Sequence, residues 1–376
     1  MRIAIDARML LTRPTGIGRY IFNLVKYLGV IDRVNEYIVL TNDRKLINIP
    51  GMHSNIHIEQ VNSRPMTIAE QFALPLVLNR LKCDVFHAPS FVIPRMLPSK
   101  SVITLHDLTH IKFNGEFNKL VQLYYKCIVR PSTKKARLII ADSESSKKDI
   151  INWANIDASR VRVTSLAVEN NYRLVNDKNV LKNVKIKYKI GKEYILYNGN
   201  KKPHKNVESL VKAFCRLRTE KKIDYSLVIV GERNDNEAET NYLGLEKIVN
   251  DYKLLNEVIY TGHVADDDLV LLYNAAAVFV FPSFYEGFGL PPLEAMSCGC
   301  PVVASNSSSL PEVCGDAAQY VDPYNIDDIV EGIYKVFSDD KLRKDLIRKG
   351  FLRAAAFSWE KCARETLSIY EEVFKS

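Results

Sequence analysis

The sequence lacks any apolar run long enough to cross a bilayer. Its longest apolar stretch, Ala275–Phe281, is far shorter than the roughly 18 to 20 residues that a membrane-spanning helix needs. A signal peptide is also not expected, because Arg2, Asp6 and Arg8 interrupt the first ten residues, where such a leader has a continuous apolar core. We therefore expect a cytoplasmic chain that begins with a β-strand.

Cysteine is scarce, at 7 of 376 residues, and the thiols are scattered and odd in number. This pattern favours reduced thiols over a disulfide framework. Cys298 and Cys300 are the only close pair, and no second Cys/His cluster would complete a zinc site around them. No metal site is predicted.

The net charge of +8 is unevenly distributed. Residues 1–170 hold 24 Lys+Arg against 14 Asp+Glu, a net charge of +10, whereas the other residues have a net charge of −2. A basic first half predicts an anionic partner, either a phospholipid surface or a lipid-linked phosphate. Nucleic acid is not expected, because RNA-binding glycine-aromatic motifs and helix-turn-helix patterns are missing.

The stretch from Glu116 to Arg137 mixes apolar side chains with six basic ones. A basic amphipathic helix can lie on an anionic membrane. It can equally be an ordinary surface helix with one buried face, and the sequence leaves both readings open.

Short β-branched runs alternate with amphipathic segments along the chain, which is typical of parallel sheets covered by helices. The predicted strands form two series, at 3–6, 37–41, 85–87, 101–105, 138–141 and 161–164, and at 194–197, 226–230, 258–260, 278–281, 301–304 and 319–321. We therefore predict an α/β fold of two doubly wound domains, 1–175 and 176–355, joined by a polar linker around 168–185. Ligands of such sheets bind beyond the carboxyl ends of the strands. A last helix within 356–376 could pack on either domain, and packing back on the first is one option.

One segment of the second half carries a strand, a loop and a helix in succession. The apolar run Val278–Phe281 is followed by the loop Glu286–Leu290, after which Pro291 and Pro292 open a helix that ends at Gly299. The free N–H groups and partial positive charge of a helix N-terminus bind anions such as diphosphate. Gly287 and Gly289 would let the backbone approach such an anion closely.

Glu286 and Glu294 bracket this anion site. Both cannot contact phosphate without repulsion, and carboxylates accept hydrogen bonds from hydroxyls. One would then hold sugar hydroxyls and the other a ribose. The alternative for Glu294 is a favourable charge in the first turn of the helix.

The segment PSFYEGFGLPPLEAM, Pro282–Met296, resembles the E-x7-E signature of retaining family 4 glycosyltransferases, in the glycogen-synthase and mannosyltransferase-like group of bacterial polysaccharide type. The resemblance covers nearly the whole chain. It implies the GT-B fold, two Rossmann-like domains that face each other across a deep cleft, the first on the acceptor side and the second binding the nucleotide sugar. It also implies that Glu286 lies at the transferred sugar, that Glu294 holds the ribose, and that loop amides of Gly287, Phe288, Gly289 and Leu290 touch sugar and phosphates.

A second element of the resemblance is ILYNGNKKPHKN, 195–206. Lys205 would neutralise the diphosphate as the bond to the sugar breaks. Many relatives carry an Arg directly after the glycine that is Gly199 here, whereas this chain has Asn200 at that position. We still expect Asn200 to contact the nucleotide-sugar donor. Lys201, Lys202 or His204 could substitute for the missing cation, or each could be a solvated loop residue.

A third element is TGIGRY, Thr15–Tyr20. It is not a dinucleotide fingerprint, because Ile21 stands where the third glycine is needed. The resemblance instead places Gly16 and Gly18 across the cleft from the diphosphate and sugar, and leaves Tyr20 structural.

Two histidines are predicted at strand ends. The resemblance matches His106 to a residue beside the transferred sugar, while His87 could be functional or structural.

The turn TGHV, Thr261–Val264, resembles family turns that lie against the nucleotide base. The resemblance therefore implies that Val264 and His263 are base contacts. The following Asp266–Asp268 imitate a DxD metal motif of another fold. We assign them to a helix cap and first turn, since the GT-B architecture stabilises the leaving group without a metal.

These features predict retaining transfer of a hexose, mannose or rhamnose-like, from a GDP-, UDP- or dTDP-linked donor, with catalytic roles for His106, Glu286 and Lys205. The acceptor would be a lipid-linked or polysaccharide hydroxyl in O-antigen, capsule or exopolysaccharide synthesis, with no cofactor or metal. The basic first domain could contact the inner face of the plasma membrane. Two competing readings are a GT-B nucleotide-sugar epimerase and a catalytically silent membrane-surface binding protein.

Overall fold

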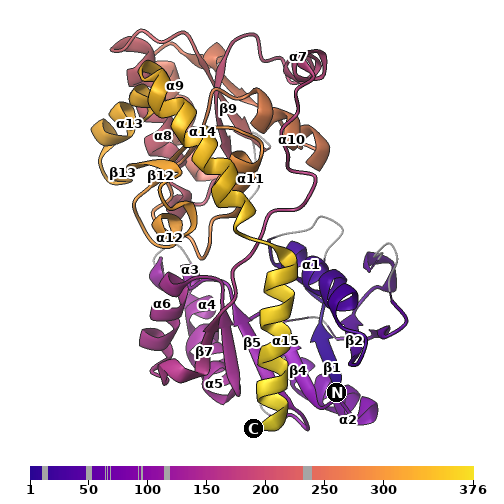
Figure 1. The fold of residues 1–376 in the computed structure, drawn as a ribbon. Helices are drawn as coiled ribbons and strands as arrows, with labels where there is room; N and C mark the ends of the chain where they lie inside the picture. The colour runs from indigo at the N-terminus through magenta and orange to yellow at the C-terminus, as the bar shows by residue number, and fades with distance from the viewer. Residues whose placement is uncertain are drawn as a thin grey trace. The chain divides into compact units, whose positions relative to one another are not determined.

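The computed structural model describes residues 1–10, 16–47, 53–63, 65, 67, 69–91, 93–94, 96–113, 119–231 and 239–376. Thr15 and residues 116–118 of the predicted basic helix lie outside them. The chain divides into two compact units (Figure 1). The first unit comprises Met1–Leu166 and Ser358–Ser376, and the second comprises Ala167–Phe357.

The described residues of the first unit form a seven-stranded parallel sheet in the order β3-β2-β1-β4-β5-β6-β7. Its strands are β1 Arg2–Asp6, β2 Glu36–Thr41, β3 Ile56–Gln60, β4 Val85–Ala88, β5 Lys100–Leu105, β6 Leu138–Ala141 and β7 Val161–Val163. The helices are α1 Gly16–Ile31, α2 Glu70–Leu81, α3 Thr109–Lys112, α4 Lys119–Tyr124, α5 Arg130–Lys135, α6 Glu144–Ala154 and α15 Trp359–Lys375, with a π-helical turn at Tyr125–Val129 between α4 and α5. The strand order reverses between β1 and β4, which is where doubly wound sheets bind ligands.

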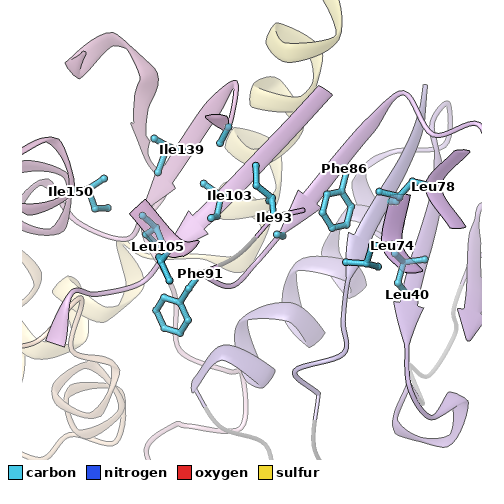
Figure 2. Packing of buried hydrophobic residues seen from close by; sticks show 14 of the residues in the cluster. Leu40, Leu74, Leu78, Phe86, Phe91, Ile93, Ile103, Leu105, Ile139 and Ile150 are labelled. Carbon is cyan, nitrogen blue, oxygen red and sulfur yellow. The ribbon is translucent and has the colours of Figure 1, made fainter. Parts of the chain in front are cut away.

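One core cluster of this unit lies on a face of the sheet that is covered by helices. Figure 2 shows Phe86 of β4 and Ile103 of β5 among these buried side chains, with Leu74 and Leu78 of α2 and Ile150 of α6. Each fully buried aliphatic or aromatic side chain contributes about 1.5–3 kcal/mol. Because both faces of a parallel sheet are covered, its strands read as nearly continuous apolar runs.

The C-terminal helix α15 belongs to the first unit and packs against α1, β4 and β5 (Figure 1). Ser358 caps it by accepting a hydrogen bond from the N–H of Lys361 at 3.1 Å. Trp359 and Tyr370 are buried on its inner face. Residues 358–376 therefore complete the fold of the first unit, although they follow the second unit in the chain.

The described part of the second unit forms a six-stranded parallel sheet in the order β10-β9-β8-β11-β12-β13. Its strands are β8 Tyr194–Asn198, β9 Ser226–Val230, β10 Val258–Tyr260, β11 Val278–Phe281, β12 Val302–Ser305 and β13 Ala318–Val321. The helices are α7 Lys178–Lys187, α8 Val207–Thr219, α9 Glu239–Asp251, α10 Asp266–Ala275, α11 Leu290–Ser297, α12 Leu310–Cys314, α13 Ile326–Ser338 and α14 Asp340–Ala355, with short 3-10 turns including η5, Pro203–Lys205. Here the strand order reverses between β8 and β11.

The predicted architecture of two doubly wound parallel sheets is confirmed. Strand β3 was not predicted from the sequence; it lies at the edge of the first sheet and is only partly buried. An edge strand buries less surface, so its apolar signal is weak.

Within the described ranges, no helix combines the length and apolar character needed to cross a membrane. All seven cysteines fall within these ranges and are free thiols, and Cys127 is the exposed one.

Candidate functional site

Lys205 ends the turn η5, just beyond the carboxyl end of β8. The next residue, Asn206, adopts a left-handed backbone conformation with φ of 57°. Its side-chain amide donates hydrogen bonds to the carbonyl oxygens of Pro282 at 3.1 Å and Pro323 at 2.7 Å. These bonds fix the Lys205 loop against the segments that follow β11 and β13.

The loop Glu286–Gly289 connects β11 to α11 and is held by two serines. The N–H of Glu286 donates to Ser308 Oγ at 3.0 Å. Ser309 Oγ donates to the carbonyl oxygens of Glu286 at 3.0 Å and Phe288 at 2.7 Å. Gly289 has φ of 112°, and a Cβ placed there would lie 2.6 Å from Leu310 Cδ2. The loop therefore has a fixed shape that requires glycine at its last position.

The two loops bring Lys205 and Glu286 into direct contact. Lys205 Nζ lies 2.7 and 2.8 Å from the two carboxylate oxygens of Glu286. Only 15% and 11% of these side chains are exposed, and the ammonium also lies 5.5 Å from the ring centroid of Phe281. The two charges that the sequence assigns to diphosphate and to sugar thus form one ion pair.

Glu294 is buried in the second turn of α11, with 7% of its surface exposed. It accepts a hydrogen bond from the hydroxyl of Tyr273 at 3.0 Å, and that hydroxyl accepts one from Asn198 Nδ2 at 2.9 Å. Burial and the charge of Glu294 raise the pKa of Tyr273, so its hydroxyl stays a donor. The first-turn alternative for Glu294 is wrong, because the first turn of α11 contains no acidic residue.

Sequence reasoning missed Asn198 and Tyr273. Asn198 ends β8, and a polar residue at a strand end was a usable signal. Tyr273 lies within the apolar pattern of α10 and is completely buried, so the sequence offers no sign of its role.

Asn200 does not present its side chain as an Arg would. Its side-chain oxygen accepts a hydrogen bond from the N–H of Lys202 at 3.2 Å, and its carbonyl accepts one from the Tyr197 hydroxyl at 2.9 Å. Lys201 is buried with Nζ 5.3 Å from the Tyr260 ring centroid, and His204 is buried as well. The Asn200 hydrogen bonds thus stay within its own loop. The ammonium of Lys201 instead contacts Tyr260, the last residue of β10.

The predicted base contacts lie after β10. His263 lines a cavity of about 420 Å³ together with Lys187, Tyr188, Lys189, Tyr260, Thr261, Ala265 and Asp268. Val264 is half-buried beside it in the chain. Asp266–Asp268 occupy the first turn of α10, as expected, but the cap position belongs to Ala265. Within the described residues, no three His, Cys, Asp or Glu side chains gather as metal ligands would.

In the first unit, His106 and Asp142 follow the neighbouring strands β5 and β6. His106 Nδ1 lies 2.8 Å from Asp142 Oδ2, and the two side chains are 13% and 2% exposed. Burial lowers the pKa of His106, but the charge and hydrogen bond of Asp142 outweigh it and raise the pKa above its usual value. The sequence analysis did not select Asp142, although it also directly follows an apolar strand.

His87 is a structural residue of the first unit. Its Nδ1 lies 2.6 Å from the hydroxyl of Tyr370 on α15, and its Nε2 lies 2.7 Å from Thr104 Oγ1. It is completely buried, and burial together with the nearby His106 lowers its pKa to about 3. Both ring nitrogens are thus used to attach α15 to the sheet.

Gly16 and Gly18 lie in the first turn of α1, which follows β1. Gly16 is exposed and Gly18 is buried. Tyr20, two residues further, is buried with its ring edge-on to His106 at 4.8 Å between centroids. That Gly16, Gly18 and His106 meet the Lys205–Glu286 pair at one site stays a prediction.

Comparison with known proteins shows similarity along both units. Residues 14–171 match the family "Glycosyltransferase Family 4", and residues 182–353 match "Glycosyl transferases group 1". The O-antigen chain mannosyltransferase B of Escherichia coli is 34% identical over 95% of this chain and 96% of its own length. The serotype-specific mannosyltransferase WbdA of Escherichia coli is 31% identical over 94% of this chain, which spans 45% of that longer protein.

Solved structures share the fold at low sequence identity. A glycosyltransferase from Rickettsia africae superposes with a TM-score of 0.76 at 19% identity, covering 100% of this chain and 99% of that one. HepE of Anabaena, in complex with UDP and glucose, superposes with a TM-score of 0.77 at 19% identity, covering 99% and 100%.

Proposed function

This chain belongs to the family 4 glycosyltransferases and has the GT-B fold, and we propose that it transfers a hexose, with mannose favoured, from a nucleoside diphosphate sugar. The acceptor is a hydroxyl of a lipid-linked or polysaccharide chain in O-antigen synthesis. The names of the similar O-antigen mannosyltransferases support mannose and this acceptor class. The nucleotide is GDP, UDP or dTDP, and the reaction takes place in the cytoplasm.

The observation that carries this proposal is the Lys205–Glu286 pair beside the N-terminus of α11. An ammonium and the N–H groups at a helix N-terminus together form a site for an anionic diphosphate. Lys205 and the amides of residues 287–290 neutralise the charge that develops on the leaving phosphate, which is the largest electrostatic demand of the reaction. In this proposal they supply that charge without a metal ion.

The carboxylates then recognise hydroxyls. Glu286 accepts hydrogen bonds from the transferred sugar once Lys205 shares its charge with the diphosphate, and Glu294 accepts from the ribose while Tyr273 holds one of its oxygens at 3.0 Å. Val264 and His263 contact the base. A buried carboxylate that a tyrosine already orients does not have to reorganise on binding.

Transfer proceeds with retention of the anomeric configuration. The acceptor hydroxyl attacks on the face that the diphosphate leaves, and the departing phosphate oxygen takes the proton of that hydroxyl. Glu286 and His106 orient the sugar, and the carboxylate of Glu286 supports its oxocarbenium-like charge. No enzyme carboxylate forms a bond to the sugar in this scheme.

The proposed membrane contact is peripheral and involves the basic first unit, without nucleic acid. Leu120 and Leu123 of α4 are 70% and 55% exposed, and Lys126 and Cys127 in the following turn are exposed as well. Apolar side chains beside lysines on one surface support the amphipathic reading of this segment.

A thermal-shift panel of GDP, UDP, dTDP and ADP, and of their sugars, identifies the donor, and nucleotide release with and without acceptor measures transfer. We expect Glu286→Ala and Lys205→Ala each to lower kcat about 10²–10³-fold. Lys212→Ala is the matched control, because that half-buried lysine on α8 forms its ion pair with Glu208, four residues earlier on the same helix.

Three outcomes contradict the proposal. The first is that no nucleotide stabilises the protein, and the second is that both site variants retain full transfer. The third is that the donor is converted into an epimer without any acceptor. An inverted anomeric product, read by NMR, contradicts retention alone.

A further inference from the structure

His106 and Asp142 are adjacent because of the register of the first sheet. Leu105, the last residue of β5, pairs with Ala141, the last residue of β6. The next residue of each strand therefore emerges at the same carboxyl edge. There His106 Nδ1 and Asp142 Oδ2 lie 2.8 Å apart, and Ser146 Oγ donates to the backbone carbonyl of His106 at 3.3 Å.

This contact fixes the orientation of the imidazole. Because Nδ1 is used by Asp142, Nε2 points to the opposite side of the ring. Nε2 is buried and forms no hydrogen bond of good geometry among the described residues, although the Pro89 carbonyl is near enough to favour the protonated ring. The edge-on Tyr20 ring, 4.8 Å away between centroids, limits rotation of the imidazole. A buried ring nitrogen held in one direction is a group prepared to bind something else.

The charge on this ring follows from its surroundings. Asp142 is 2% exposed, and its Oδ1 has no hydrogen-bond partner in the described part of the chain. A buried carboxylate needs a cationic partner, and His106 is the basic group that the structure places against it. The titratable and polar groups that face the pair from the packed elements are Asp107 after β5, the Pro89 carbonyl after β4, His87 of β4, Tyr20 of α1 and Cys362 of α15.

Two of these neighbours favour a protonated ring, and none of the others carries a charge near neutral pH that opposes it. Asp107 and the Pro89 carbonyl act on His106 in the same direction as Asp142. His87 acts in the opposite direction, but its low pKa of about 3 leaves it neutral. Tyr20 and Cys362 are buried groups whose pKa is raised, so they add no negative charge near neutral pH.

We propose that Asp142 is a positioning residue that keeps His106 doubly protonated, so that Nε2–H donates a hydrogen bond to a hydroxyl oxygen of the sugar substrate. His106 then acts as a cationic donor and not as a proton acceptor. This inference rests on the proposed function for the nature of the substrate, whereas the protonation of His106 rests on the first unit alone. An imidazolium at this edge complements a sugar hydroxyl oxygen.

The first test is an NMR titration of the His106 ring in the whole protein, without substrate. We expect a midpoint above the usual 6.5 or so in the wild type. In Asp142→Asn the amide oxygen can still accept from Nδ1, but the charge is lost, and we expect the midpoint to fall by about 1–3 pH units. Asp142→Glu keeps the charge and should keep a raised midpoint.

Asp107→Asn is the matched control. It removes the same charge one residue from His106, but Asp107 Oδ1 accepts the N–H of Thr109 at 2.9 Å, so a smaller shift is expected. A midpoint in Asp142→Asn equal to that of the wild type overturns the proposal. If Asp142→Asn does not fold, a wild-type midpoint below about 6.5 overturns it equally.

The second test is the pH profile of transfer. If the protonated ring is required, kcat falls above its pKa, and Asp142→Asn moves this alkaline limb to lower pH. The loss is then about 10- to 1000-fold at alkaline pH and disappears at a pH below both midpoints. Nucleotide affinity, proposed to depend on the second unit, is unchanged.

His106→Gln separates donation from a merely structural role. Its neutral amide donates at every pH, so the alkaline limb should disappear while some activity remains. An unchanged alkaline limb in this variant overturns the donor role. If the wild type transfers no sugar from any donor, the proposed function fails, while the NMR titration still decides the role of Asp142.

Discussion

Lys205 and Glu286 neutralise each other at the carboxyl edge of the second sheet, with both carboxylate oxygens within 2.8 Å of the same ammonium. A diphosphate bound at the N-terminus of α11 would need that ammonium as well. Glu286 and the donor phosphates are thus expected to share one cation, which couples recognition of the sugar to recognition of the leaving group.

Glu286→Gln should separate these two effects. Removing the carboxylate charge leaves Lys205 available to phosphate, so a nucleoside diphosphate should bind about three- to tenfold more tightly, or about 0.7–1.4 kcal/mol. At the same time kcat should fall about 10²-fold or more, because the transferred sugar loses a charged acceptor. Calorimetric titration and initial rates measure the two effects, with Glu208→Gln on the exposed face of α8 as control. Weaker nucleotide binding in Glu286→Gln would show that the ion pair preorganises Lys205 and does not compete with phosphate.

Tyr273→Phe tests the role assigned to Glu294. The substitution removes the hydroxyl that lies 3.0 Å from the carboxylate and leaves a buried oxygen without that donor, which costs about 1–3 kcal/mol. We expect nucleoside diphosphate affinity to fall about 5- to 50-fold. Inorganic pyrophosphate has no ribose, so its affinity should not change. A parallel loss for both ligands would place the effect on the phosphate site and contradict the ribose role.

Gly289→Ala tests the shape of the loop before α11. An alanine there would need φ of 112° and would place Cβ 2.6 Å from Leu310 Cδ2. We expect a loss of about 2–4 kcal/mol in the free energy of unfolding, from backbone strain and overpacking together. In Gly191→Ala the new Cβ meets none of the described atoms within 4 Å, and we expect a change within about 0.5 kcal/mol. Urea unfolding of both variants measures the difference, and equal effects would contradict the steric argument.

His87 should make the first unit sensitive to acid. Its pKa is lowered to about 3 by burial, below that of the unfolded chain, so the folded state binds fewer protons. Its contribution to stability is therefore complete above about pH 6.5 and is lost by about 1.4 kcal/mol per pH unit as the pH falls towards the folded pKa.

His87→Gln removes this titration but keeps groups able to bond Tyr370 and Thr104. We expect the variant to be less stable than the wild type at pH 8 and to approach it as the pH falls to about 5. Denaturant unfolding at several pH values measures this convergence. Parallel stability curves for the two proteins would show that His87 is not buried in its neutral form.

Much of the fold could be predicted because its signals are local. Parallel strands buried on both faces are short, continuous apolar runs, so both sheets were visible in the sequence, and only the partly polar edge strand β3 was missed. The strand-loop-helix arrangement around Glu286 was visible for the same reason, since Gly289 and the two prolines each have a conformational role that depends on their neighbours in the chain.

The sequence by itself determined which elements form and which polar residues follow the strands, including Lys205, His106 and Glu286. Only the tertiary structure decided which of these residues meet. Lys205 and Glu286 are 81 positions apart, and His106 and Asp142 are 36 apart, yet each pair follows two strands that the sheet order places next to each other. Strand order and register are set by packing of the whole sheet, as is the return of α15 to the first unit, and no local pattern of residues encodes them.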